Sequence, residues 1–141
     1  MAQSLAAVSL LVNDYDEAIE YYVGMLDFVL VEDSPQPGAP GKRFVRVMPK
    51  PTADNTHPSC LLLARAKNDA EKAAVGAQTG GRVFLFLHTD DFDGDYQRYR
   101  ERGVDFIEAP RYEEYGSVVV FRDCYGNLWD LVQPATSSPA A

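Results

Sequence analysis

The sequence has little cysteine and fewer basic than acidic side chains. Its two cysteines, Cys60 and Cys124, have no CxxC spacing. They can form at most one bridge, so neither a disulfide framework nor a thiolate zinc site has support, and we expect reduced thiols. Thirteen Lys and Arg stand against 21 Asp and Glu, which gives a formal charge of −8. An acidic chain is repelled by polyanions, so we expect no nucleic-acid partner.

Long apolar runs are also missing. No stretch approaches the roughly 18 consecutive apolar residues that a membrane-spanning helix needs. The first residues lack the basic and apolar regions of a signal peptide. We therefore expect a cytoplasmic protein with no membrane partner. The pair Gly80-Gly81 is not part of a GxGxxG or P-loop pattern, so we expect a turn there rather than a phosphate site.

The length and composition are those of a globular protein. The chain has 141 residues, of which 46% are hydrophobic and 11% aromatic. At about 150 residues per domain, this length allows one compact domain or two small ones. A chain of this size buries enough apolar surface to fold without disulfides or a structural metal.

The sequence contains an internal repeat. Residues 8–16 resemble residues 85–93 at a constant offset of 77, and each segment is a short apolar strand running into an acidic turn. Helical spacing of apolar residues follows each turn and predicts helices at about 15–25 and 92–102. Further strands are predicted in both halves, at 28–31, 43–48, 60–64, 104–107, 117–122 and 128–132. The repeated unit is therefore a βαβββ module.

The two modules define the expected domain organisation. Module one covers about 5–66 and module two about 82–134. The linker 67–81 carries a short helix, with Asn68 as its N-cap and Glu71 as the reciprocal partner. We expect a single domain over 1–134 and a flexible tail at 135–141.

Two segments carry a family resemblance. They are the strand-to-helix turn VNDYDEAIEYY and the closing stretch FRDCYGNLWDL, which covers residues 121–131. With the two modules, they resemble the vicinal oxygen chelate superfamily, which includes glyoxalase I, bleomycin-resistance proteins and extradiol dioxygenases. The resemblance implies an α+β fold in which two βαβββ modules form a curled, half-open mixed sheet around a ligand cavity. It also implies a homodimer.

The metal-dependent enzymes of that superfamily use four ligand positions. By the resemblance, these positions fall at Ala7, Leu63 (or Leu62), Phe84 and Asp130. Only Asp130 has a side chain that can coordinate a metal ion. One carboxylate does not hold a divalent cation, so we expect no catalytic metal, no cofactor and no glyoxalase I activity.

The same positions suggest a ligand cavity. Strand alternation places His88 on one face with Phe84 and Phe86. The expected lining is Phe84, Phe86, His88, Leu63, Leu128 and Asp130, with the mouth near Tyr115 in a loop at 111–116. Structural alternatives remain for both polar residues. His88 could be a hydrogen-bonded strand-end histidine, and Asp130 could form an ion pair with Arg46, Arg65 or Arg122.

Two function classes follow from these residues. The first is a protein that binds a small hydrophobic or aromatic molecule in the cup without a catalytic metal. The alternative is a lyase-like or dioxygenase-like enzyme of the superfamily. In that case His88 and Asp130 would be the catalytic candidates, in acid-base chemistry or in a divergent metal site.

Overall fold

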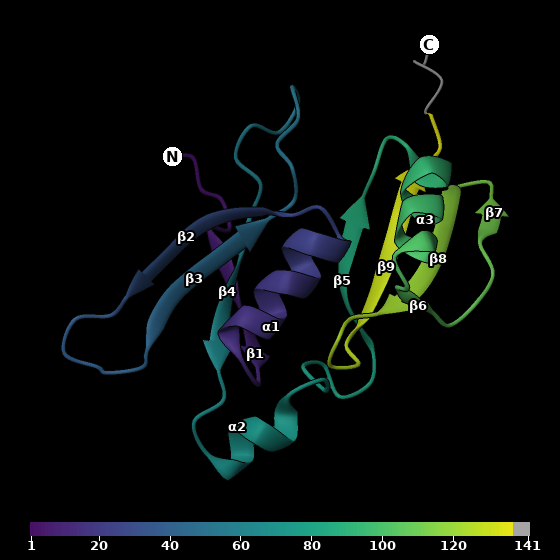
Figure 1. Ribbon diagram of the computed structural model, residues 1–141. Helices are drawn as coiled ribbons and strands as arrows, with labels where there is room; N and C mark the ends of the chain where they lie inside the picture. The colour runs from purple at the N-terminus through teal and green to yellow at the C-terminus, as the bar shows by residue number, and fades with distance from the viewer. Residues whose placement is uncertain (137–141) are drawn as a thin grey trace. The chain divides into compact units, whose positions relative to one another are not determined.

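The computed structural model describes residues 1–136 and divides the chain into two compact units. The first unit is Met1–Gln78 and the second begins at Thr79. Each unit has its own β-sheet and its own helix or helices (Figure 1). Of the tail expected at 135–141, residues 137–141 lie outside the described residues.

The first unit contains a four-stranded sheet. Its strands are β1 (Ala7–Val12), β2 (Val29–Pro35), β3 (Arg43–Met48) and β4 (Cys60–Arg65). The strand order is β1-β4-β3-β2, in which β1 runs parallel to β4 and the other pairs are antiparallel. The first strand of the unit therefore pairs with its last strand.

The helix after β1 changes its pitch. Helix α1 (Tyr15–Ile19) begins at the N-cap Asp14, whose carboxylate accepts a hydrogen bond from the Glu17 amide at 2.8 Å. From Glu20 to Met25 the chain continues as the π-helix η1, so the helix expected at about 15–25 forms in two parts of different pitch. The Leu26 amide donates to the Tyr21 carbonyl five residues back, as this wider turn requires.

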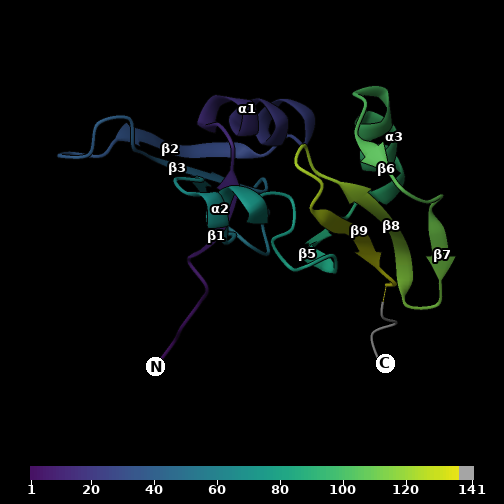
Figure 2. The same cartoon turned by 90° about the horizontal axis from the view of Figure 1, so that it is seen from below.

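One face of the first sheet forms the core of its unit. The buried side chains on this face are Leu10, Val12, Val45, Val47, Leu61 and Leu63. Helix α1 packs against β3 and β4 and covers this face (Figure 2). The short helix α2 (Asp69–Ala74) contacts β1 and begins at the N-cap Asn68, as expected.

The second unit repeats the arrangement with one addition. Its elements are β5 (Val83–His88), α3 (Phe92–Glu101), β6 (Asp105–Phe106), β7 (Arg111–Glu113), β8 (Gly116–Arg122) and β9 (Leu128–Pro134). The strand order is β5-β9-β8-β6, β7 also pairs with β8, and β5 runs parallel to β9. The expectation of a loop at 111–116 was wrong for Arg111–Glu113, because these residues pair with β8.

Aromatic rings hold helix α3 against the second sheet. Phe121 on β8 stacks on Trp129 of β9, with ring centroids 6.0 Å apart and planes 12° apart. Tyr99 of α3 meets Phe121 edge to face, also at 6.0 Å. The odd-numbered residues Val119, Phe121, Trp129 and Leu131 of β8 and β9 are buried on this face.

The fold predicted from the repeat is confirmed. In each unit the first strand lies at a sheet edge and runs parallel to the last strand, so β1 and β5 occupy equivalent positions. The fold is of the mixed α+β class, with two sheets of mostly antiparallel strands. Within residues 1–136, no helix is long and apolar enough to cross a membrane.

Candidate functional site

The even-numbered side chains of β8 and β9 point away from the face under α3. The register places Phe86 of β5 beside Asp130, which in turn pairs with Val120. His88 lies beside Val132 in the same way. We call this side of the second unit the open face. It consists of Phe86, His88, Val118, Val120, Leu128, Asp130 and Val132.

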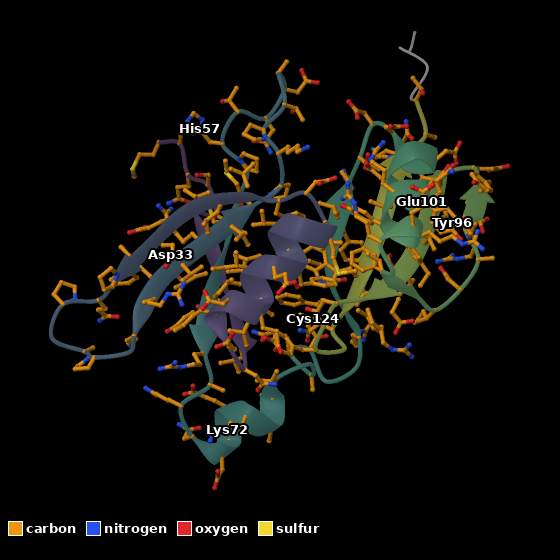
Figure 3. All side chains as sticks on the ribbon, viewed as in Figure 1. Asp33, His57, Lys72, Tyr96, Glu101 and Cys124 are labelled. Atoms are coloured by element: carbon orange, nitrogen blue, oxygen red, sulfur yellow. The ribbon has the colours of Figure 1, made fainter. Side chains whose placement is uncertain are left out.

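Phe86 and His88 are the exposed members of the open face. The Phe86 side chain is 65% exposed. The His88 side chain is exposed at the end of β5 and makes no hydrogen bond within the described residues. A structural hydrogen bond of His88 is therefore not observed. The other histidine, His57, lies in the connection between β3 and β4, where its Nδ1 is 2.9 Å from the Thr56 hydroxyl (Figure 3).

Asp130 is the polar centre of the open face. Its Oδ1 atom is buried and has no hydrogen-bond partner within residues 1–136. Burial raises the pKa of the Asp130 carboxyl above its ordinary value of 3.8. The positive charge of Arg111 opposes this increase in pKa, and the negative charge of Glu108 adds to it. The site therefore holds a carboxylate that lacks a donor.

The three arginines considered as partners of Asp130 make other contacts within their own units. The partners are Glu32 for Arg46, at 3.0 Å, Asp105 for Arg122, at 3.2 Å, and the Gly41 carbonyl for Arg65, at 2.9 Å.

The expected position of Phe84 on the face of Phe86 and His88 was wrong. The register shifts between Val83 and Leu85, so Phe84 is an extra residue of β5 in a β-bulge. Its ring meets the Trp129 indole edge to face, with centroids 6.1 Å apart. Phe84 therefore packs on the side of Trp129 and does not line the open face.

Leu63 also lies elsewhere than expected. Its side chain is 1% exposed in the core of the first unit, opposite Leu10 in the register of β1 and β4. The alternation of β4 places its neighbour Leu62 on the other face, where Leu62 is half-buried. Leu63 is therefore a packing residue of the first unit, where it also contributes to the lining of a pocket.

Tyr115 lies in the turn between β7 and β8. It is 60% exposed, and its hydroxyl accepts a long hydrogen bond of 3.5 Å from the Arg111 guanidinium. Arg111 also donates to Glu108 at 3.1 Å. Tyr115 and Arg111 thus form an exposed polar edge at β7 and β8.

The four positions that the resemblance assigned to metal ligands do not form a metal site. Ala7 has no donor atom, Leu63 packs in a core, and the Phe84 ring packs on Trp129. Asp130 alone offers oxygen ligands. In the part of the chain that the structure describes, no three His, Cys, Asp or Glu side chains gather in a way that could hold a metal ion. The donor set does not fit a divalent cation.

The first unit contains a pocket that the sequence analysis missed. Its volume is about 780 Å³, within the range of small-molecule sites. The ends of β1, β3 and β4 line it together with the β2–β3 connection. The available signal was the two basic pairs Lys42-Arg43 and Arg65-x-Lys67, which lie at the start of β3 and the end of β4 and which the topology brings together.

Two βαβββ units, each with its first strand parallel to its last strand, define the fold class of this protein. A family model described as Glyoxalase/Bleomycin resistance protein/Dioxygenase superfamily matches residues 4–131. The chain belongs to this superfamily.

Relatives and solved structures agree with this assignment. An uncharacterized protein of Shewanella frigidimarina (strain NCIMB 400) is 48% identical over 139 residues, which cover 99% of each chain. The crystal structure of TnmS3, an antibiotic binding protein from Streptomyces sp. CB03234, superposes with a TM-score of 0.75 at 28% identity. That superposition covers 95% of this chain and 98% of TnmS3. A glyoxalase/bleomycin resistance protein from the same Streptomyces strain gives a TM-score of 0.69 at 30% identity and covers 92% of this chain and all of its own.

Proposed function

We propose that this protein binds a small hydrophobic or aromatic molecule on the open face of the second unit. The observation that carries the proposal is the unpartnered Oδ1 of Asp130 beside an exposed phenylalanine, Phe86. A buried carboxylate oxygen without a donor is costly, and a ligand that donates a hydrogen bond removes that cost. The ring of Phe86 offers a stacking surface next to it.

The chemistry of this pair favours a particular kind of ligand. An aromatic ring would stack on Phe86, and an ammonium, N–H or O–H group on that ring would donate to Asp130. An anionic ligand is disfavoured because it would face the Asp130 carboxylate. The printed description of TnmS3 as an antibiotic binding protein supports a binding role for this chain.

Binding without chemistry is favoured over catalysis. The register places His88 beside Val132 and Asp130 beside Phe86, so the two catalytic candidates are diagonal neighbours on adjacent strands. No hydrogen bond joins them within residues 1–136. The remaining ligand positions of the metal enzymes carry no donor atoms. We therefore propose a binding protein that needs no metal.

The test uses three matched naphthalene probes and isothermal titration calorimetry. We expect 2-naphthylmethylamine to bind more tightly than 2-naphthylmethanol, and 2-naphthoate to bind most weakly at this face. Asp130→Asn should remove the preference for the amine and cost it about tenfold in affinity. Phe86→Ala should weaken the amine and the alcohol to a similar extent.

Two control variants remove the same kinds of side chain at positions outside the open face. Asp54→Asn removes an exposed carboxylate from a loop of the first unit, and Leu5→Ala removes an exposed apolar side chain near the N-terminus. Neither should change the affinity for 2-naphthylmethylamine. The proposal fails if Asp130→Asn and Phe86→Ala bind the amine as tightly as the unchanged protein does.

A further inference from the structure

The pocket of the first unit has a basic rim. Four cationic side chains line it, and they are Lys42, Arg43, Arg65 and Lys67. The guanidinium groups of Arg43 and Arg65 both lie over the ring of Tyr15, at 5.0 and 5.2 Å from its centroid. This stacking fixes two long side chains at one point of the pocket wall.

The positive charge of this rim is only partly neutralised. Arg43 forms ion pairs with Asp33 at 2.8 Å and with Asp16 at 3.0 Å. Within residues 1–136, the ammonium groups of Lys42 and Lys67 have no carboxylate partner, and Arg65 bonds to a carbonyl rather than to a carboxylate. In a chain with a net charge of −8, such a concentration of cations needs an explanation.

The one acidic residue in the lining does not neutralise the lysines. Glu71 accepts hydrogen bonds from the Lys67 backbone amide at 3.1 Å and from the Asn68 side chain at 3.3 Å. Both bonds belong to the capping of helix α2. The Glu71 carboxylate is therefore held by the start of α2, and no ion pair joins it to the Lys67 ammonium in the described chain.

Gly41 allows the rim to form. Its φ is +81°, and a Cβ at this position would lie 3.3 Å from the Arg65 guanidinium. The absence of a side chain lets Arg65 approach and donate to the Gly41 carbonyl at 2.9 Å. The β2–β3 connection and the end of β4 are thereby joined at the pocket.

The interior of the pocket is apolar with one unpaired polar atom. Leu11, Leu62 and Ala64 are half-buried in the lining, and Phe44 is 42% exposed. The Oε1 atom of Gln36, also in the lining, is buried without a hydrogen-bond partner in the described chain. A ligand for this pocket therefore needs an apolar body, an anionic group for the rim and a donor for Gln36.

We propose that this pocket binds an organic anion with an apolar ring, in which a carboxylate, sulfonate or phosphate ester meets Lys42 and Lys67. This inference goes beyond the proposed function, because it concerns the first unit and the opposite ligand charge. The ring lies on Leu62 and Phe44, and an N–H or O–H group of the ligand donates to Gln36.

Two fluorescent probes that differ by one charged group test this inference. 8-Anilino-1-naphthalenesulfonate carries a sulfonate and an N–H donor, and N-phenyl-1-naphthylamine is the same molecule without the sulfonate. We expect the double variant Lys42→Gln/Lys67→Gln to lose about tenfold or more in affinity for the sulfonate. The same variant should bind the neutral probe unchanged. Amide chemical shifts of residues 62–67 should respond to the sulfonate in the unchanged protein.

The matched control removes two positive charges from lysines outside the pocket. Lys50→Gln/Lys72→Gln removes two lysines that do not line the pocket, and Lys72 lies on helix α2 (Figure 3). It should leave the affinity for the sulfonate within about twofold of the original. Asp130→Asn and Phe86→Ala should also leave the affinity for the sulfonate unchanged. The experiment therefore tests this inference independently of the proposed function. Equal losses in the pocket and control double variants, or shifts confined to the second unit, would overturn the inference.

Discussion

Asp130 shows how a single residue acquires a role from its surroundings. The sequence identifies it as the one possible ligand among four positions of a metal enzyme. The structure leaves its Oδ1 buried without a donor, and burial raises the pKa of its carboxyl. The same atom that cannot hold a metal alone can accept a hydrogen bond from a ligand. The buried Oδ1 atom lacks a hydrogen-bond donor, and this both lowers the stability of the fold and favours a ligand that supplies a donor.

The raised pKa of Asp130 predicts a pH-dependent effect of its removal. A carboxyl whose pKa is higher in the folded than in the unfolded state destabilises the fold when it ionises, so its penalty grows as the pH rises above 3.8. We expect Asp130→Asn to be more stable than the unchanged protein by about 0.5–1 kcal/mol at neutral pH, because the group is only partly buried. The difference should vanish in acid.

Urea denaturation at about pH 7 and about pH 3.5 measures this difference. Asp54→Asn, in an exposed loop, serves as the reference for removing a carboxylate. A loss of stability in Asp130→Asn at neutral pH would show that the carboxylate is held by a partner.

At the scale of elements, small departures from regular geometry decide which side chains face a ligand. The bulge at Phe84 inserts one residue into β5 and turns its ring onto Trp129, while Phe86 and His88 keep the open face. Helix α1 likewise passes into the π-helical η1, where the adjacent Tyr21 and Tyr22 are both buried. Neither departure has a residue pattern that distinguishes it from a regular strand or helix.

The hairpin between β7 and β8 depends on Gly116. Its φ is +142°, and an added Cβ would meet the carbonyl of Gln133 and lie 3.0 Å from the Pro134 Cα of β9. We expect Gly116→Ala to lower the free energy of unfolding by about 2 kcal/mol or more, because the backbone of β9 has no room to move away. Urea denaturation measures the change.

Gly24 is the matched control for this substitution. It lies in η1 with an ordinary φ, and nothing lies within 4 Å of the position of its Cβ. Gly24→Ala should leave the stability unchanged or raise it by about 0.5–1 kcal/mol, since alanine favours helical backbone. Similar effects of the two substitutions would contradict the structural role given to Gly116.

At the scale of the whole molecule, we propose that the two units form one domain over residues 1–134 and that two chains form a homodimer. The sheet of the first unit ends at β1 and β2, and that of the second at β5 and β6. Such edge strands carry unpaired backbone groups that another strand or chain can cover. A closed two-fold dimer is the commonest way to cover them.

Light scattering coupled to size-exclusion chromatography tests the assembly. We expect a mass of about twice the 15.6 kDa of one chain at micromolar concentrations. A mass of one chain across that range would refute the dimer. A dimer that persists in 1 M salt would indicate an apolar rather than an ionic interface.

The sequence determined the elements and their order. The repeat at an offset of 77, the N-caps Asp14 and Asn68, and the strands at 43–48 and 128–132 are local signals, because capping and periodicity involve residues within a few positions. They sufficed for two βαβββ units, whereas the loss of the metal ligands followed from the resemblance to the superfamily. Strand alternation also placed Phe86 and His88 on one face of β5, and the pairing of β5 with β9 brings Asp130 beside Phe86.

Only the tertiary structure decided which side chains share a surface. One inserted residue in β5 moved Phe84 to the other face, and the pairing of Leu63 with Leu10 placed Leu63 in a core. The basic pocket required β3 and β4 to pair before Arg43 and Arg65 could meet over Tyr15. Register and pairing depend on contacts between residues far apart in sequence, so no local pattern specifies them.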